Sequence, residues 1–287
     1  MGHDERFWRE FITALRFVGW TAALLPVQII LVRFNMPFAK RLPMIYHRGV
    51  CRLLAFRVEQ HGEISRTKPT LFVCNHTSYL DISVLGAVLR GSFVAKSEVR
   101  SWPLFGLLAR LQRTVFVERR AVRTAEQRDM MIQRLEMGDN LILFPEGTSN
   151  DGNRVLPFKS AFFGAAEKEV GGKPLTVQPV SISYTRLDGI PVGRSYRPYF
   201  AWYGDMEMAG HLWNVFGLGQ TTVAIEFHQP VTIAEFASRK EMAAHCHRVV
   251  SDGVSRGIHG RLAKVAKHAW WASKNRLIRR KIGVPSA

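Results

Sequence analysis

The feature that most constrains the fold is an alternation of short apolar runs and helix-like stretches from residue 70 onward. Apolar runs typical of strands lie at residues 56–60, 70–74, 92–95, 114–118, 141–144, 176–184 and 222–227. The clearest helical periodicity lies at residues 44–56, 81–89, 104–111 and 121–137. This alternation predicts an α/β domain with a mixed, mostly parallel central sheet flanked by helices.

An uncharged apolar run at residues 17–32 precedes this domain, between Arg16 and Arg33. As a helix it would cover roughly 24 Å of a hydrocarbon core about 30 Å thick. Starting at residue 11 lengthens the run but includes Arg16, and Pro26 invites a kink. We interpret the run as a membrane anchor, either one short transmembrane helix or a hairpin in one leaflet. A buried core helix is the alternative. A cleaved signal peptide is disfavoured, because bulky residues follow the run.

The charge balance is strongly basic, with 40 Lys and Arg against 23 Asp and Glu and a net charge of +17. Such a chain is expected to meet anionic partners: a membrane surface, an acidic carrier or nucleic acid. Six basic residues and no acid lie between the apolar run and Glu59. By the positive-inside rule this places the bulk of the chain at the cytoplasmic face of the inner membrane.

Three regions are therefore expected along the chain. Residues 1–58 form the membrane anchor and a basic amphipathic helix, residues 59–260 the α/β domain, and residues 261–287 a basic tail containing Trp270 and Trp271. The tail suits an anionic membrane better than nucleic acid, given the anchor, although a merely solvated tail stays open. Residues 189–219, rich in Gly, Trp and Tyr, are expected to form an insertion or long loop.

The three cysteines are scattered without CxxC spacing, which indicates a reducing compartment and no disulfide framework. The cluster His245-Cys246-His247 has no second ligand pair nearby, so we interpret it as a polar helix segment and expect no metal site.

The first candidate for chemistry is the turn after the apolar run at residues 70–74, where Asn75 and His76 are followed by Asp81. On one regular helix His76 and Asp81 would point about 140° apart. If the helix begins at Ser78, Asp81 falls in its first turn and can face the imidazole. An aspartate bound to one ring nitrogen leaves the other free as a general base. The structural alternative is a capping-box-like pair of Ser78 and Asp81.

A second apolar run, at residues 141–144, ends in a similar turn of Pro145, Glu146, Gly147 and Thr148. Alone, it would be interpreted as an ordinary junction between a strand and a turn. Two such turns carry more weight, because the carboxyl ends of strands in an α/β sheet border one crevice.

The two turns together resemble the glycerolipid acyltransferase family that includes bacterial 1-acylglycerol-3-phosphate acyltransferases. Residues 75–81 match its NHX4D motif and residues 144–148 its FPEGT motif, in the right order and at the right distance. Residues 115–119 resemble the second block of that family, residues 177–180 the fourth, and residues 157–159 the segment after FPEGT. The resemblance covers residues 70–180.

The resemblance implies transfer of an acyl chain from a thioester of acyl carrier protein or coenzyme A to the hydroxyl of a lysolipid. His76 would be the general base and Asp81 would orient it, with no acyl-enzyme, no metal and no other cofactor. The positions that the resemblance assigns to substrate binding are Asn75, Phe116, Arg119, Glu146, Gly147 and Thr148.

Two departures from the family pattern concern the acceptor. Ser149 stands where the family often has an arginine credited with holding the acceptor phosphate, and Arg113 stands where the second block usually opens with glycine. The acceptor is therefore either 1-acylglycerol-3-phosphate, with Arg113 or Arg154 as a substitute ligand, or the phosphate-free lyso-ornithine lipid.

Two functions outside this class compete with acyl transfer. A non-catalytic membrane-surface protein is the main alternative to an acyltransferase. A serine hydrolase is disfavoured by the lack of a GxSxG motif.

Overall fold

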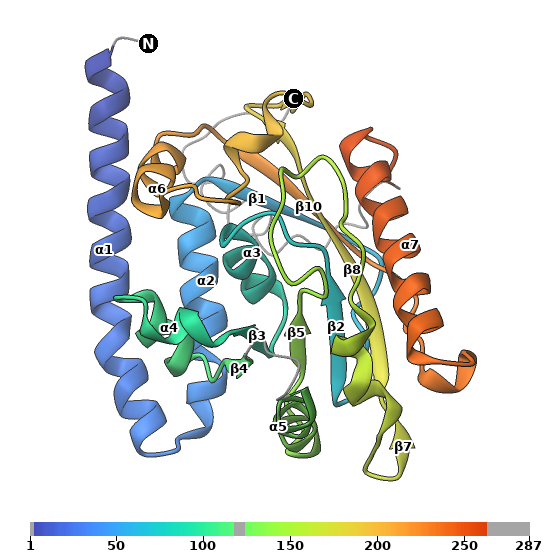
Figure 1. The fold of residues 1–287 in the computed structure, drawn as a ribbon. Helices are drawn as coiled ribbons and strands as arrows, with labels where there is room; N and C mark the ends of the chain where they lie inside the picture. Colours follow the sequence, from blue (N-terminus) through green and yellow to red (C-terminus); the bar gives the residue numbers. More distant parts are fainter. Residues whose placement is uncertain (1–2, 118–123, 263–287) are drawn as a thin grey trace, which may run out of the picture.

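The computed structural model describes residues 3–117 and 124–262 and shows a central sheet with helices on both faces (Figure 1). The sheet strands are β1 (Phe56–His61), β2 (Thr70–Cys74), β3 (Ser92–Lys96), β4 (Val115–Val117), β5 (Leu141–Leu143), β8 (Thr176–Leu187), β9 (Ile190–Pro191) and β10 (Thr221–Phe227). They follow the order β1-β10-β8-β2-β5-β3-β4, with β9 beside β8. A separate two-stranded ribbon joins β6 (Glu169–Val170) to β7 (Lys173–Pro174).

Most neighbouring strands of the sheet are parallel. The antiparallel pairs are β8 with β10 and β8 with β9, so that β1, β9 and β10 run in one direction and the remaining strands in the other. The predicted mixed, mostly parallel sheet is confirmed, and each expected strand is present with ends that differ by a few residues. Strand β2 lies at the centre between β5 and β8, with Leu71 opposite Leu141 and Val177.

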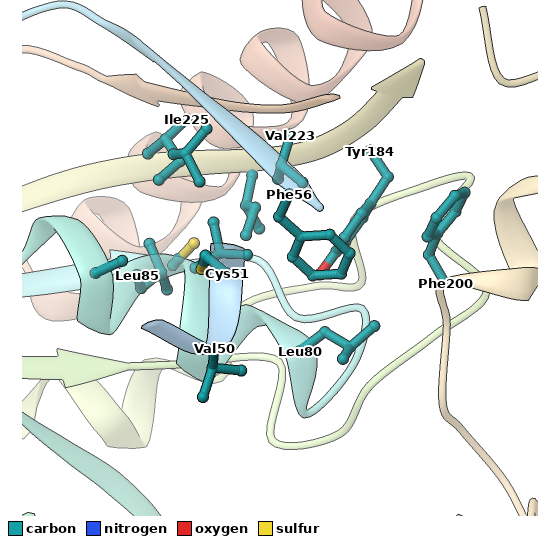
Figure 2. Packing of buried hydrophobic residues seen from close by; sticks show 14 of the residues in the cluster. Val50, Cys51, Phe56, Leu80, Leu85, Tyr184, Phe200, Val223 and Ile225 are labelled. Atoms are coloured by element: carbon teal, nitrogen blue, oxygen red, sulfur yellow. The ribbon is translucent and has the colours of Figure 1, made fainter. Parts of the chain in front are cut away.

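Helices cover both faces of the sheet. They are α1 (His3–Arg33), α2 (Leu42–Leu53), α3 (Leu80–Val88), α4 (Phe105–Leu111), α5 (Thr124–Glu136), α6 (Met208–Phe216) and α7 (Arg239–Ile258). Because side chains alternate along a strand, Phe72 and Cys74 of β2 face one core and Leu71 and Val73 face the other. Helices α2 and α3 close the first core, part of which Figure 2 shows, and α5 and α7 close the second.

Two regions contribute helices to the core where the sequence had indicated a loop or a membrane anchor. Residues 189–219 are not one long loop, because they contain β9 and α6, and α6 packs its buried Val215 and Phe216 into the first core. Helix α2, which we grouped with the anchor, also enters that core through Val50 and Cys51. The predicted helix at His245–His247 is part of α7, and Cys246 is buried there.

Helix α1 lies along the outside of the domain against α2 and α6 (Figure 1). Its outer side is apolar and exposed, with Leu15 and Val18 more than half accessible. Helix α1 is continuous through Pro26, so the apolar run does not contain the turn that a hairpin would need. Because most of the run is exposed, α1 is not a buried core helix. By length and composition this one helix could cross a membrane.

The side of α1 that faces the protein carries polar groups. Gln28 is buried, and its side-chain amide donates hydrogen bonds to the carbonyls of Ala39 (3.0 Å) and Leu111 (2.9 Å). The Thr21 hydroxyl donates to the Phe17 carbonyl and lies 3.1 Å from the Tyr46 hydroxyl. The Gln28 bonds and the Thr21–Tyr46 contact fix the rotation of α1 about its own axis, because only one side of the helix can make them.

Candidate active site

The first turn follows β2 and leads directly into α3. Helix α3 begins at Leu80, so Asp81 lies in its first turn, where the helix dipole stabilises a negative charge. His76 lies in the preceding turn, and its Nδ1 is 3.0 Å from Asp81 Oδ2. The predicted pairing of these two side chains is therefore present in the structure.

Asp81 is completely buried, and hydrogen bonds reach both of its oxygens. Besides the imidazole, the backbone N–H groups of Thr77 (2.7 Å) and Ser78 (2.9 Å) donate to Oδ2. The Tyr184 hydroxyl of β8 donates to Oδ1 at 2.9 Å. A carboxylate can only accept, so the histidine proton resides on Nδ1 and Nε2 presents its lone pair.

Asp81 thus combines two roles that were expected as alternatives, orienting the imidazole and capping the helix. It accepts from the Ser78 backbone as a capping residue would, and it also orients His76. The other half of a capping box is absent, because the Ser78 hydroxyl accepts from the Leu80 N–H rather than from Asp81.

The second turn follows β5, the parallel neighbour of β2, and its Glu146 reaches the first turn. Glu146 Oε1 accepts the backbone N–H of His76 at 2.7 Å. Its Oε2 accepts from the Asn150 side chain (2.7 Å) and the Leu156 backbone (2.8 Å). The side chain of Glu146 therefore fastens the two turns together at the carboxyl ends of adjacent strands.

Burial raises the pKa of Glu146 to about 7, although its three hydrogen bonds act in the opposite direction and lower it. The nearby Asp81 charge adds to the increase. At this pKa the Glu146 carboxyl is partly protonated at neutral pH.

The aromatic ring of Phe144, at the end of β5, sets the plane of the imidazole. The rings of Phe144 and His76 stack with centroids 4.1 Å apart and 18° between their planes. With Asp81 holding Nδ1 and Phe144 holding the ring face, the imidazole of His76 is fixed in orientation and still 21% exposed.

Comparisons with known proteins agree with this geometry. The acyltransferase family model matches residues 55–183. A lyso-ornithine lipid O-acyltransferase from Brucella abortus is 45% identical over 239 residues, which cover 82% of this chain and 90% of that protein. A lyso-ornithine lipid O-acyltransferase from Rhizobium meliloti is 43% identical over 263 residues, which cover 90% of this chain and 90% of that protein. The chain belongs to the glycerolipid acyltransferase family.

Two further relatives of this acyltransferase carry a different acceptor in their names. A 1-acyl-sn-glycerol-3-phosphate acyltransferase from Neisseria gonorrhoeae is 32% identical over 188 residues, covering 63% of this chain and 69% of that protein. The crystal structure of the 1-acyl-sn-glycerophosphate acyltransferase PlsC from Thermotoga maritima matches with a TM-score of 0.63. It is 24% identical and covers 90% of this chain and all of that chain. This last likeness confirms the fold.

The remaining positions that the resemblance assigns to substrate binding have different surroundings. The Asn75 side chain exchanges two hydrogen bonds with the backbone of Ile182 on β8, a structural role that joins the first turn to the sheet. Phe116 lies on β4 with the Arg100 guanidinium 6.0 Å from its ring. Thr148 is exposed, and Arg119 lies outside the described residues.

Arg113, one of the two substitute phosphate ligands, does not reach this site. Its guanidinium is 3.1 Å from Asp139, just before β5 and thus at the opposite end of that strand from Glu146. Its φ of 61° lies in the left-handed region, which explains why the family pattern has glycine there. The departure at residue 113 therefore concerns the backbone of a turn, and the expectation of a phosphate ligand there is wrong.

Two contributors were missed by the sequence analysis. Tyr184 lies four residues beyond the fourth block, and only its register beside β2 brings its hydroxyl to Asp81. Trp202 donates its backbone N–H to the Thr77 carbonyl and accepts from the Ser149 hydroxyl, so it joins both turns from the segment before α6. No local motif marks either residue.

Proposed function

We propose that this acyltransferase is membrane-bound and transfers a fatty acyl chain from an acyl thioester to the hydroxyl of lyso-ornithine lipid. The observation that carries the proposal is the His76–Asp81 pair, whose 3.0 Å contact leaves Nε2 as the free basic nitrogen. Among the described residues, none forms a hydrogen bond to that nitrogen, so an acceptor hydroxyl can occupy its place.

In the proposed reaction, His76 Nε2 removes the proton of the acceptor hydroxyl as its oxygen attacks the thioester carbonyl. The C–O bond forms, and the tetrahedral intermediate collapses with loss of the thiolate. The proton on His76 then passes to the thiolate, which restores the neutral imidazole. Asp81 stabilises the transient imidazolium through Nδ1, and its own charge is held by the other donors around it.

The acceptor is assigned from two observations. The relatives from Brucella and Rhizobium, at 45% and 43% identity, are named for lyso-ornithine lipid. Ser149 replaces the arginine expected for a phosphate, and its hydroxyl donates to the Trp202 carbonyl instead of facing a ligand. The second candidate is 1-acylglycerol-3-phosphate, which the name of the Neisseria relative supports.

The membrane assignment rests on α1. Its outer side exposes Leu15, Val18 and Ile30, each more than half accessible, a pattern that suits contact with acyl chains. The basic residues that follow α1 favour the cytoplasmic face of the inner membrane, where thioesters of acyl carrier protein or coenzyme A are made.

The test is an acyl-transfer assay on membranes that contain the full chain, with a labelled acyl donor and each acceptor in turn. The wild-type protein is expected to acylate lyso-ornithine lipid faster than 1-acylglycerol-3-phosphate. The His76→Ala variant should lose turnover by a factor on the order of 10³ or more, because the general base is gone. The exposed histidine variant His259→Ala serves as the matched control and should retain full activity.

Two outcomes would contradict the proposal. Undiminished turnover by His76→Ala would show that the first turn is structural. No transfer by the wild-type protein to any lysolipid would exclude the acceptor class.

A further inference from the structure

Lys159, in the segment after the second turn, places its ammonium group against that turn. The backbone N–H of Lys159 donates to the Pro145 carbonyl at 3.0 Å, which brings the two segments together. A Cβ atom added to Gly147 would lie 2.9 Å from Lys159 Nζ. The Lys159 side chain therefore crosses the face of Gly147, and it can do so because residue 147 has no side chain.

Gly147 meets two requirements at this position. Its φ of 70° is in the left-handed region, and the space beside its Cα is occupied by the Lys159 ammonium. The first requirement alone is met elsewhere in this chain by non-glycine residues such as Asn35 and Arg113. The second requirement is specific to the turn that carries Glu146.

The ammonium of Lys159 lacks a carboxylate partner within the described part of the chain. No ion pair formed by residues 3–117 and 124–262 includes Lys159. Glu146, the carboxylate of the turn that Lys159 crosses, directs its oxygens to His76, Asn150 and Leu156 instead. The exposed side chain of Lys159 lies over a motif turn without a carboxylate partner there, so its ammonium group is available to an anionic ligand.

The other cations considered for this role are Arg113 and Arg154. Arg113 pairs with Asp139 at the opposite end of β5, and the exposed Arg154 interacts electrostatically with Asp151. Ser149, which replaces the family arginine, donates its hydroxyl to the Trp202 carbonyl. Lys159 thus offers a positive charge beside the turn in which the family arginine is replaced by serine.

We propose that Lys159 binds the anionic group of the acceptor headgroup and thereby sets acceptor specificity. This inference rests on the proposed function. The ligand is a pair of negatively charged oxygens, supplied by the carboxylate of an ornithine headgroup or by the phosphate of a glycerol-phosphate headgroup. An ammonium is a point charge that accepts either geometry, unlike the bidentate fork of an arginine.

The test compares acceptors that differ by this one charge, in membranes containing the full chain. The first pair is lyso-ornithine lipid and its methyl ester, and the second is 1-acylglycerol-3-phosphate and 1-monoacylglycerol. Lys159→Met removes the ammonium and keeps the alkyl stem, Lys159→Arg keeps a charge, and the exposed Lys168→Met is the matched control.

We expect Lys159→Met to raise the KM for the charged acceptor about 10-fold and to leave the KM for its neutral partner unchanged, since hydrogen bonds to charged groups are the stronger class. Lys159→Arg should recover most of the loss, and Lys168→Met should behave as wild type. The acceptor pair that shows the effect identifies the anion as carboxylate or phosphate.

Three results would overturn the inference. The first is full discrimination between charged and neutral acceptors in Lys159→Met, with the wild-type protein active. The second is an equal rise in KM for both members of a pair, which would indicate a purely structural role. The third is no transfer by the wild-type protein to any acceptor, which would reject the proposed function and this inference with it.

Discussion

The turns that follow β2 and β5 each carry a buried carboxylate, but the two carboxylates bind groups at different distances along the chain. Asp81 accepts from His76, Thr77 and Ser78, all within five residues of it, and from one distant hydroxyl. Glu146 accepts from the His76 backbone, 70 residues away, and from its own loop. The first carboxylate orients His76, the proposed base, and the second fixes the turn that holds it.

The two carboxylates therefore have different tasks in one site: Asp81 takes part in the proposed reaction, and Glu146 supports the structure. The contact of Asp81 with the imidazole changes during the proposed reaction, because the ring gains and loses a proton. The contacts of Glu146 are to backbone and amide N–H groups, whose protonation does not change. Loss of Asp81 should therefore affect turnover most, whereas loss of Glu146 should affect turnover and stability together.

The largest effect is expected for Asp81→Asn. An asparagine keeps one acceptor oxygen but carries no charge, so the transient imidazolium of His76 loses the anion that stabilises it. Its amide NH2 group also faces either the Tyr184 hydroxyl or the three donors at the Oδ2 position. By analogy with the same change in a serine-protease triad, turnover should fall by about 10³ to 10⁴. Initial rates at saturating acceptor measure it, with a circular dichroism melt to confirm folding. A loss below tenfold would show that Asp81 acts mainly as a cap.

The second effect is expected for Glu146→Gln, which turns one of the two acceptor oxygens into a donor. Either His76 N–H or the pair Asn150 and Leu156 loses its partner, at a cost of about 1–3 kcal/mol. Chemical denaturation should report that loss, and turnover should fall about tenfold because the first turn is less firmly held. If Glu146→Gln unfolds at the same denaturant concentration as the wild-type protein, Glu146 does not have the stabilising role that distinguishes it from Asp81.

Glu146 also makes a prediction about pH. Its folded-state pKa of about 7 is raised from 4.5, so folding favours the protonated form. That stabilising contribution is fully present below pH 4.5 and is lost as the pH rises through about 7. Unfolding free energies measured at several pH values should therefore fall more steeply over this window in the wild-type protein than in Glu146→Gln. Parallel curves would assign the slope to other groups.

A smaller effect is expected for Tyr184→Phe, a positioning change that acts through Asp81. Burial and the Asp81 charge raise the pKa of the Tyr184 hydroxyl well above its ordinary value, so the hydroxyl is protonated and donates. Its removal leaves the Asp81 carboxylate with one donor fewer, which should lower kcat about tenfold, leave KM unchanged and change the pH dependence of kcat. Tyr46→Phe, which loses a hydroxyl paired with Thr21, is the control. An unchanged pH profile would assign Tyr184 to packing alone.

The smallest effect is expected for Arg113→Gly. Glycine suits the φ of 61° at this position, while the half-exposed ion pair with Asp139 is lost. The two changes oppose each other, so stability should move by less than about 1 kcal/mol. The KM for either acceptor should not change, and a rise of tenfold for 1-acylglycerol-3-phosphate would return Arg113 to the site.

The sequence allowed the strands, their parallel arrangement and the pairing of His76 with Asp81 to be predicted, because each depends on local pattern. Periodicity places a strand before each turn, and the family motifs mark the turns themselves. The contacts of Tyr184 and Trp202 with the two turns were not predictable from the sequence. The position of Tyr184 follows from the register of β8 beside β2, and that of Trp202 from the packing of the segment before α6.

Other errors came from using composition where tertiary contacts decide. The Gly- and aromatic-rich stretch at residues 189–219 was expected to be a loop, yet Val215 and Phe216 give α6 a buried side. Arg113 was considered as a phosphate ligand because it is basic and opens the second family block. The start of a strand and its end lie at opposite ends of the sheet, however, and Arg113 lies at the end away from Glu146.

The polar inner side of α1 has a consequence for how the acyltransferase is built. Gln28 and Thr21 bind the helix to the domain in one rotational setting, while its apolar residues face outward. The helix is therefore fixed in orientation relative to the domain and is not a flexible tether. Whatever layer its outer side enters, the imidazole of His76 keeps a fixed height and tilt relative to that layer. A generic apolar helix of the same length would preserve attachment and lose that alignment.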